Sequence, residues 1–242
     1  MIREVTMATK RVSNPDFITK PEYLKALRGM QAANLAGLVL NGQATISWET
    51  LNVLTDDDAE AAHLHFRTLF DHWLHKRQLP KAYIWVVERG PHLGIHSHFA
   101  FSMPKSYSPP FRQWFRSVTP TLTGKEPVRE VSERGYVETL HSEVRRDDDV
   151  SAQLRTFRYF MKGLEPNAGL AGAHGLKLQP QGRIMFKRIG LSRSIDRSAA
   201  DRVAASYGGW AAIEQSCAPV SDDHYRLWKS RHGNEMDPTL ER

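Results

Sequence analysis

Alternation of apolar and polar residues predicts a β-hairpin near the middle of the chain. Residues 82–87 (Ala-Tyr-Ile-Trp-Val-Val) form a continuous apolar run, which is typical of a buried strand, and residues 95–101 alternate between two faces. The intervening residues 89–94 contain two glycines and a proline and can turn the chain back for antiparallel pairing. On the second strand His96 and His98 leave the same face. The opposite face carries Ile95, Phe99 and Phe101.

Helical periodicity predicts the elements that surround this hairpin. Thr55 or Asp56 is a good N-cap for an apolar stripe that follows it, and the acidic triplet at residues 147–149 is typical of a second helix start. Metal binding by that triplet is the less favoured alternative. The predicted helices span about residues 23–40, 56–77, 111–118 and 150–164. Further strands are predicted at about residues 44–51 and 136–140.

The order of these elements predicts an α+β fold. From residue 44 onward the order is strand, helix, strand, strand, helix, strand, helix, which favours an antiparallel sheet of about four or five strands flanked by helices, of the split βαβ type. We expect an N-terminal arm at residues 1–42, a central domain at residues 43–165 and a basic C-terminal extension at residues 166–242.

Composition narrows the class of protein and of partner. The chain of 242 residues has a formal net charge of +6, which favours an anionic partner such as nucleic acid. Its single cysteine excludes an internal disulfide and a cysteine zinc cluster, so we expect a reducing compartment, by default the cytoplasm. No apolar run approaches the length of a membrane span, and no membrane partner is expected.

The histidine pair of the hairpin is a candidate metal site. On a strand, His96 and His98 would have Cβ atoms about 7 Å apart on one face, a separation that suits one shared cation. Glu88, at the end of the preceding strand, can supply a carboxylate, which makes a plausible divalent-metal site. The alternative is the ordinary polar face of a half-buried sheet. His63 and His65 are also two apart, but on a helix they point about 200° apart and cannot share a ligand.

A tyrosine lies among cations on the predicted helix at residues 150–164. Its apolar stripe comprises Leu154, Phe157, Met161 and Leu164, and another face carries Arg155, Arg158, Tyr159 and Lys162. Neighbouring cations favour the phenolate form of Tyr159 and would hold a phosphate near its hydroxyl. This arrangement would serve a tyrosine nucleophile that attacks a phosphodiester. The alternative is a solvated basic face with the tyrosine at its edge.

The combination of these motifs resembles the HUH endonucleases. This family includes the rolling-circle replication initiators of plasmids and phages, relaxases and single-tyrosine transposases. The matching residues are Glu88, His96 and His98 for the metal motif, Tyr159 and Lys162 for the Tyr-x-x-Lys motif, and residues 45–50 for the first strand motif. The residue between the two histidines is usually bulky and hydrophobic in the family, whereas here it is Ser97. The resemblance implies the ferredoxin-like HUH fold.

The resemblance also implies an activity. A chain of this family would use Mg²⁺ or Mn²⁺ to nick and join single-stranded DNA, or a DNA hairpin at an origin, through a 5′-phosphotyrosine link made by Tyr159. Lys162 would balance phosphate charge. Closest among the family are the replication initiators, with a relaxase or transposase as an alternative that has the same chemistry. No phosphate-binding loop of a helicase is visible, so strand separation would need a host helicase.

Two further predictions concern nucleic-acid contacts and rival functions. The cations expected to track a DNA backbone are Arg155, Arg158, Lys187, Arg188 and Arg193; a basic surface strand and turn is the alternative for the last three. One rival function is a nucleic-acid-binding module of the same fold that does not cut. Another is a metal hydrolase whose nucleophile is water. Binding of a metal ion would favour a catalytic function over the binding module. A covalent DNA adduct would favour the tyrosine mechanism over the hydrolase.

Overall fold

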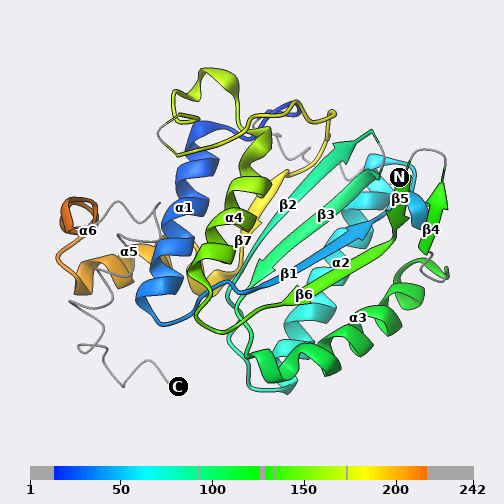
Figure 1. Ribbon diagram of the computed structural model, residues 1–242, viewed down its shortest axis with the longest axis horizontal. Helices are drawn as coiled ribbons and strands as arrows, with labels where there is room; N and C mark the ends of the chain where they lie inside the picture. The colour runs from blue at the N-terminus through cyan, green and yellow to red at the C-terminus, as the bar shows by residue number, and fades with distance from the viewer. Residues whose placement is uncertain (1–13, 92, 126–128, 133–134, 173, 217–242) are drawn as a thin grey trace, which may run out of the picture.

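A five-stranded antiparallel sheet forms the centre of the protein. The computed structural model of the chain describes residues 14–91, 93–125, 129–132, 135–172 and 174–216. The strand order is β6-β1-β3-β2-β7 (Figure 1). These strands are β1 (Gly42–Ser47), β2 (Tyr83–Gly90), β3 (Gly94–Phe101), β6 (Leu140–Val144) and β7 (Ile189–Leu191). A separate hairpin consists of β4 (Arg129–Ser132) and β5 (Gly135–Glu138). The predicted fold class, an antiparallel sheet of four or five strands flanked by helices, is confirmed.

Helices cover both faces of the sheet. One face packs against α1 (Lys20–Leu35) and α4 (Val150–Phe160), and the other packs against α2 (Asp56–Lys76) and α3 (Ser108–Thr123) (Figure 1). Two later helices, α5 (Arg197–Ser206) and α6 (Trp210–Ser216), follow β7. Short 3₁₀ helices lie at residues 49–51, 105–107, 161–163, 166–168 and 193–195. The sheet therefore separates two apolar cores, one beneath each pair of helices.

The predicted hairpin is present as β2 and β3. Glu88 lies opposite His96, and Val86 lies opposite His98. Side chains alternate across the sheet, so Phe99 and its apolar neighbours on β3 enter the core beneath α2 while the two histidines face the side of α4. Register and alternation together place the carboxylate and both imidazoles on one face.

Helix α2 confirms the interpretation of the second histidine pair. Thr55 is the N-cap, and its hydroxyl accepts a hydrogen bond from the backbone N–H of Asp58. His63 is buried in the core, whereas His65 is exposed on the opposite side of the helix. Their side chains diverge as helical geometry requires, so they do not form a shared metal site.

Helix α4 begins as predicted and ends earlier. Asp149 caps it, with its carboxylate accepting from Ala152 N at 2.9 Å. The expected apolar stripe is buried throughout: Leu154, Phe157, Met161 and Leu164. However, the α-helix ends at Phe160 and a 3₁₀ turn follows, because Leu164 is extended and the residues around it pair with Ile18. Backbone bonds join Ile18 N to Gly163 O and Glu165 N to Ile18 O, at 2.9 and 3.0 Å.

The core crosses both predicted domain boundaries. Helix α1, from the predicted N-terminal arm, contributes buried residues such as Tyr23 and Met30 to the core that α4 also lines. Strand β7, from the predicted C-terminal extension, pairs with β2 and completes the sheet. Residues 1–13 and 217–242 of these two predicted segments lie outside the described residues. In the part of the chain that the structure describes, no helix combines the length and the apolarity that crossing a membrane requires.

Candidate metal and tyrosine site

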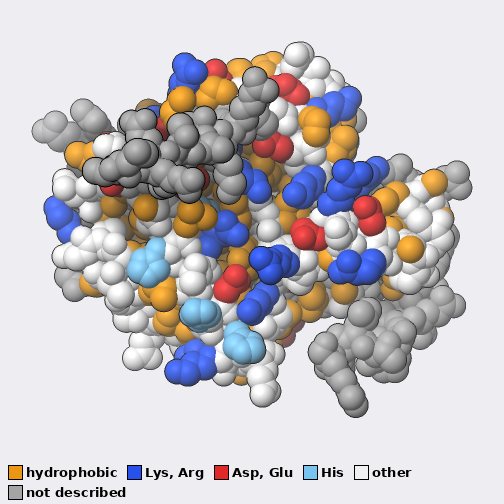
Figure 2. Space-filling view, turned by 180° about the vertical axis from the view of Figure 1, so that it is seen from behind, with side chains coloured by type: hydrophobic (Ala, Val, Ile, Leu, Met, Phe, Trp, Pro, Cys, Tyr) orange, Lys and Arg blue, Asp and Glu red, His pale blue; other side chains and the backbone are white. Residues whose placement is uncertain are grey.

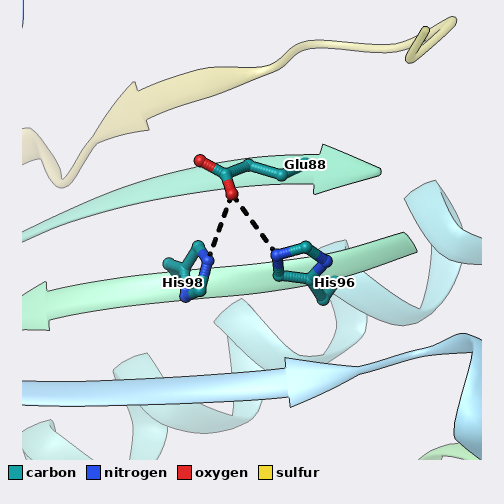
Figure 3. Close-up of side chains that lie close together, drawn as sticks. All are labelled: Glu88, His96 and His98. Carbon is teal, nitrogen blue, oxygen red and sulfur yellow. Dashed lines mark ion pairs between the residues drawn. The ribbon is translucent and has the colours of Figure 1, made fainter. Parts of the chain in front are cut away.

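Glu88, His96 and His98 converge on one face of the hairpin. Oε2 of Glu88 lies 3.3 Å from Nε2 of His96 and 3.4 Å from Nε2 of His98 (Figure 3). One potential ligand atom from each residue lies within 4.8 Å of the others. All three side chains are buried; Glu88 is only 1% exposed. The three predicted metal ligands are therefore brought together, and this group could bind a metal ion.

Each imidazole is oriented by a partner on its other nitrogen. Nδ1 of His96 lies 2.8 Å from the carbonyl oxygen of Gly94, which can only accept, so His96 carries a proton on Nδ1. Nδ1 of His98 lies 2.8 Å from the hydroxyl of Thr45 on β1. Both rings therefore turn Nε2 toward Glu88. A hydrogen bond to the distal nitrogen of a histidine is the usual way in which proteins orient a metal ligand.

Burial and local charge set the protonation of the group. Burial lowers the pKa of His98 to about 4, although Glu88 acts in the opposite direction, so His98 is neutral near pH 7. Burial by itself would raise the pKa of Glu88, but the neighbouring imidazoles of His96 and His98 and the charge of Lys162 outweigh it and hold that pKa below its usual range. A neutral imidazole and an ionised carboxylate are the forms that coordinate metals.

The polar atoms at the centre of the group fit a cation. Nε2 of His96 and Nε2 of His98 both lie near the same carboxylate oxygen, Oε2 of Glu88, at 3.3 and 3.4 Å. Apart from an ion pair with Lys162, neither oxygen of Glu88 has a hydrogen bond of acceptable geometry among the described residues, and nor does Nε2 of His98. Two nitrogen donors and one carboxylate oxygen form a ligand set for a divalent metal that leaves positions for water or substrate.

Tyr159 and Lys162 lie directly beside this group. The ring of Tyr159 contacts the ring of His98 edge-on, with centroids 5.4 Å apart, and is 52% exposed. Nζ of Lys162 lies 2.7 Å from Oε2 of Glu88 and 3.6 Å from the centroid of the Tyr159 ring. Phe160 also stacks on His98, with ring centroids 5.1 Å apart. An accessible phenol and a buried ammonium thus flank the candidate metal ligands.

Segments distant in sequence hold the turn that carries Lys162. Gln179 N donates to Lys162 O at 2.8 Å, and Ile18 pairs on the other side of the turn. Neither contact could be predicted from the sequence, because no local pattern in either segment indicates its partner. The contact of Phe160 with His98 was not predictable either, because Phe160 belongs to neither the apolar stripe nor the basic face. The strand motif that contains Thr45 does not indicate that its hydroxyl bonds His98.

The five cations predicted to contact DNA do not share one surface. Arg155 is exposed on α4, and Arg158 on the same helix donates through Nε to the carbonyl of His174 at 3.2 Å. Lys187 lies over the ring of Trp85, on the other face of the sheet. Arg193 follows β7 next to the start of β2, the end opposite to Glu88.

The burial of Arg188 conflicts with a surface contact to DNA. Its side chain is 2% exposed, and Nη2 donates to the carbonyl oxygens of Pro15 and Gly182 at 2.6 and 2.7 Å. The guanidinium is enclosed because residues 14–18 and the segment before β7 close over it. Arg188 thus joins two backbone segments in the interior, a role that its position in a cationic run did not reveal.

Ser97, the residue that departs from the resemblance, is fully buried beneath α2. Its hydroxyl oxygen accepts from Nε1 of Trp48 at 2.7 Å and lies 3.0 Å from Nδ1 of His63. The reverse face of the hairpin therefore carries a hydrogen-bonded polar cluster where an apolar residue would be expected.

Comparisons of the chain with protein-family models, with curated proteins and with solved structures found no match in any of the three.

Proposed function

We propose that this protein nicks and rejoins single-stranded DNA through a covalent link to Tyr159, in a metal-dependent reaction that starts rolling-circle replication of a plasmid or phage. The observation that carries the proposal is the contact between the exposed ring of Tyr159 and His98, with Lys162 between that ring and Glu88. A nucleophile, a cation and a set of metal ligands within contact distance are the parts that this chemistry needs.

Glu88, His96 and His98 would hold the metal ion, Mg²⁺ or Mn²⁺. When bound, the ion supplies a Lewis acid that polarises the scissile phosphate and stabilises its developing charge. Imidazole nitrogens also suit zinc or iron, and the choice of magnesium or manganese rests on the phosphodiester chemistry. All three ligands are buried, so few water molecules would compete with the substrate for the ion.

The proposed reaction exchanges one phosphodiester bond for another. The phenolic oxygen of Tyr159 forms a bond to phosphorus while the bond from phosphorus to the 3′ oxygen breaks. The phenol gives up its proton, and the departing 3′ oxygen gains one. Lys162, whose Nζ lies 3.6 Å from the centroid of the Tyr159 ring, would balance the negative charge of the phosphate. Because the new ester retains the phosphate, attack by a 3′ hydroxyl reverses the step and joins strands without another energy source.

The strand of DNA would lie along the polar face of β1 and β6. Thr45 lies opposite both His98 and His141, so these three side chains form a row across the face that contains the site. No described helix crosses the front of β1 and β6 in Figure 1, and His141 is exposed. Arg155 is exposed on α4, one helical turn before Tyr159, and would contact a phosphate. Separation of duplex DNA at an origin would depend on a host helicase.

Replacement of Tyr159 by Phe tests the proposal. The change removes the nucleophilic oxygen and keeps the ring contacts with His98 and Lys162, so the covalent adduct should fall below about one-thousandth of the wild-type amount while DNA binding persists. The measurement is a denaturing gel of labelled single-stranded oligonucleotide incubated with protein and Mn²⁺. Tyr107→Phe is the matched control, because Tyr107 contacts Trp73 on the other side of the sheet, and it should form adduct normally.

The same gel distinguishes the rival functions. Cleavage without adduct in the wild-type protein would indicate a hydrolase whose nucleophile is water. Binding without cleavage would indicate a nucleic-acid-binding module. An adduct that survives Tyr159→Phe would refute the assignment of the nucleophile.

A further inference from the structure

One buried hydroxyl connects three elements directly behind the candidate metal ligands. Ser97 lies between His96 and His98 on β3, and its side chain leaves the opposite face with 0% exposure. Its oxygen is 2.7 Å from Nε1 of Trp48 and 3.0 Å from Nδ1 of His63. Trp48 follows β1 directly, and His63 belongs to α2. Both partners are themselves buried.

One hydrogen bond of this cluster has a fixed direction. An indole N–H can only donate, so Ser97 accepts from Trp48. The hydroxyl of Ser97 and Nδ1 of His63 share a second hydrogen bond, whose direction depends on the tautomer of the ring. Ser97 therefore bonds both Trp48 and His63. Loss of the serine hydroxyl would leave the buried N–H of Trp48 without its acceptor, which favours the observed arrangement.

The cluster also reaches the strand that carries Glu88. The ring of His63 packs against Trp85 of β2 with centroids 4.5 Å apart and stacks on Phe99 of β3 at 5.5 Å. In addition, Trp48 N donates to the carbonyl of Ile95 at 2.8 Å. The strands that bear Glu88, the two histidines and Thr45 are thus joined on the reverse face around one serine.

We propose that Trp48, Ser97 and His63 form a positioning relay that holds His96 and His98 in the geometry needed to bind a divalent cation. This inference rests on the proposed metal site and adds residues that do not touch the metal. On the front face, Gly94 and Thr45 fix the rotation of each imidazole. On the reverse face, the relay fixes the backbone from which both imidazoles project.

A serine makes such a relay necessary at this position. A bulky apolar residue anchors a strand by filling volume in the core, but the side chain of Ser97 fills little and must anchor β3 through its hydrogen bonds. A metal site tolerates displacements of only about 0.5 Å in its ligands. Loss of the relay should therefore weaken cation binding even when the fold survives.

The test compares Mn²⁺ affinity across variants of the relay. Isothermal titration of the full chain with Mn²⁺, with the electron paramagnetic resonance spectrum of bound Mn²⁺ as a second readout, should show at least about tenfold weaker binding for Ser97→Ala and for His63→Ala. His63→Asn places an amide oxygen near the position of Nδ1 and should restore binding. The double variant should bind as weakly as either single variant, because both remove the same relay.

A matched control separates positioning from general stability. Thr119→Val removes another fully buried hydroxyl, one that bonds Phe115 O within α3, and should lower the melting temperature without changing Mn²⁺ affinity. If a folded Ser97→Ala or His63→Ala variant binds Mn²⁺ with wild-type affinity, the proposed relay is refuted, whereas the proposed metal site is not. Absence of Mn²⁺ binding by the wild-type chain overturns the metal site and the relay together.

Discussion

Individual residues on this sheet have functions that depend on which face they reach. Glu88 and His98 are buried on one face and present ligand atoms to each other, while Ser97, adjacent in sequence, is buried on the other and bonds His63. Strand β3 therefore carries two candidate metal ligands on one face and the hydrogen-bonded Ser97 on the other. Burial makes both arrangements sensitive to proton uptake, because a charged group in the interior loses its hydration.

His63 should make the stability of the protein depend on pH. Burial lowers its pKa from 6.5 to about 3, so the unfolded chain takes up a proton at higher pH than the folded chain does. Its contribution to stability is complete above pH 6.5 and is lost as the pH falls toward 3, at about 1.4 kcal/mol per pH unit. His98 adds a contribution of the same sign. When the pH falls from 6 to 5, the free energy of unfolding should therefore decrease by about 1.4 kcal/mol less in His63→Asn than in the wild type.

Urea unfolding in metal-free buffer at pH 7, 6 and 5 measures this difference. The two proteins should show stability curves that converge as the pH falls. Parallel curves would mean that His63 is protonated in the folded protein or that it is not buried.

Among the elements, helix α4 brings Tyr159 to the candidate metal ligands. Its N-terminus is capped by Asp149, its apolar stripe packs beneath α1, and its last turn tightens so that Lys162 reaches Glu88. Ile18 and Gln179 hold that turn from two distant segments. The position of Tyr159 thus depends on contacts at both ends of one short helix.

Removal of the cap should destabilise the protein. Asp149→Ala leaves the N–H of Ala152 without its partner, which costs about 1 kcal/mol. For a chain of this size the melting temperature should fall by roughly 2–4 °C in a thermal denaturation experiment. Asp148→Ala is the control, because Asp148 is exposed next to the cap and should change the melting temperature by less than about 1 °C. Equal decreases in melting temperature for the two variants would show that the capping bond of Asp149 does not stabilise the protein.

On one face of the molecule, charges of both signs are mixed. Seen from behind, on the side of α2, Lys and Arg side chains have Asp and Glu side chains among them (Figure 2). Arg155 lies on the helix of Tyr159, whereas Arg193 lies beyond the start of β2, about 17 Å along the strand from Glu88. A net charge of +6 therefore does not by itself locate a nucleic-acid surface.

The proposed DNA path predicts different salt dependences for these two arginines. Arg155→Ala should remove one phosphate contact and reduce the slope of log affinity against log salt concentration for single-stranded DNA by about 0.7. Arg193→Ala removes the same charge far from the site and should leave the slope unchanged. Fluorescence anisotropy with a labelled oligonucleotide at several salt concentrations provides the measurement. A larger effect of Arg193→Ala would place the DNA on the opposite end of the sheet.

Local patterns in the sequence predicted several of the elements and the partners within one hairpin. Periodicity and caps identified α2 and the start of α4, because those signals depend on residues a few positions apart. Alternation along β3 put His96 and His98 on one face, and a short loop brought Glu88 opposite His96. Such contacts follow from backbone geometry over a short stretch of chain, so they could be predicted without knowledge of the rest.

Contacts between segments far apart in the sequence became apparent only in the folded structure. The contact of Tyr159 with His98, the bond between Ser97 and His63, and the burial of Arg188 beneath residues 14–18 all join segments that no local pattern pairs. The same holds for α1 and β7, which the sequence analysis placed outside the central domain and which complete its core and its sheet. Long-range packing depends on which apolar surfaces of the whole chain fit together best. The local pattern of one segment does not carry this information.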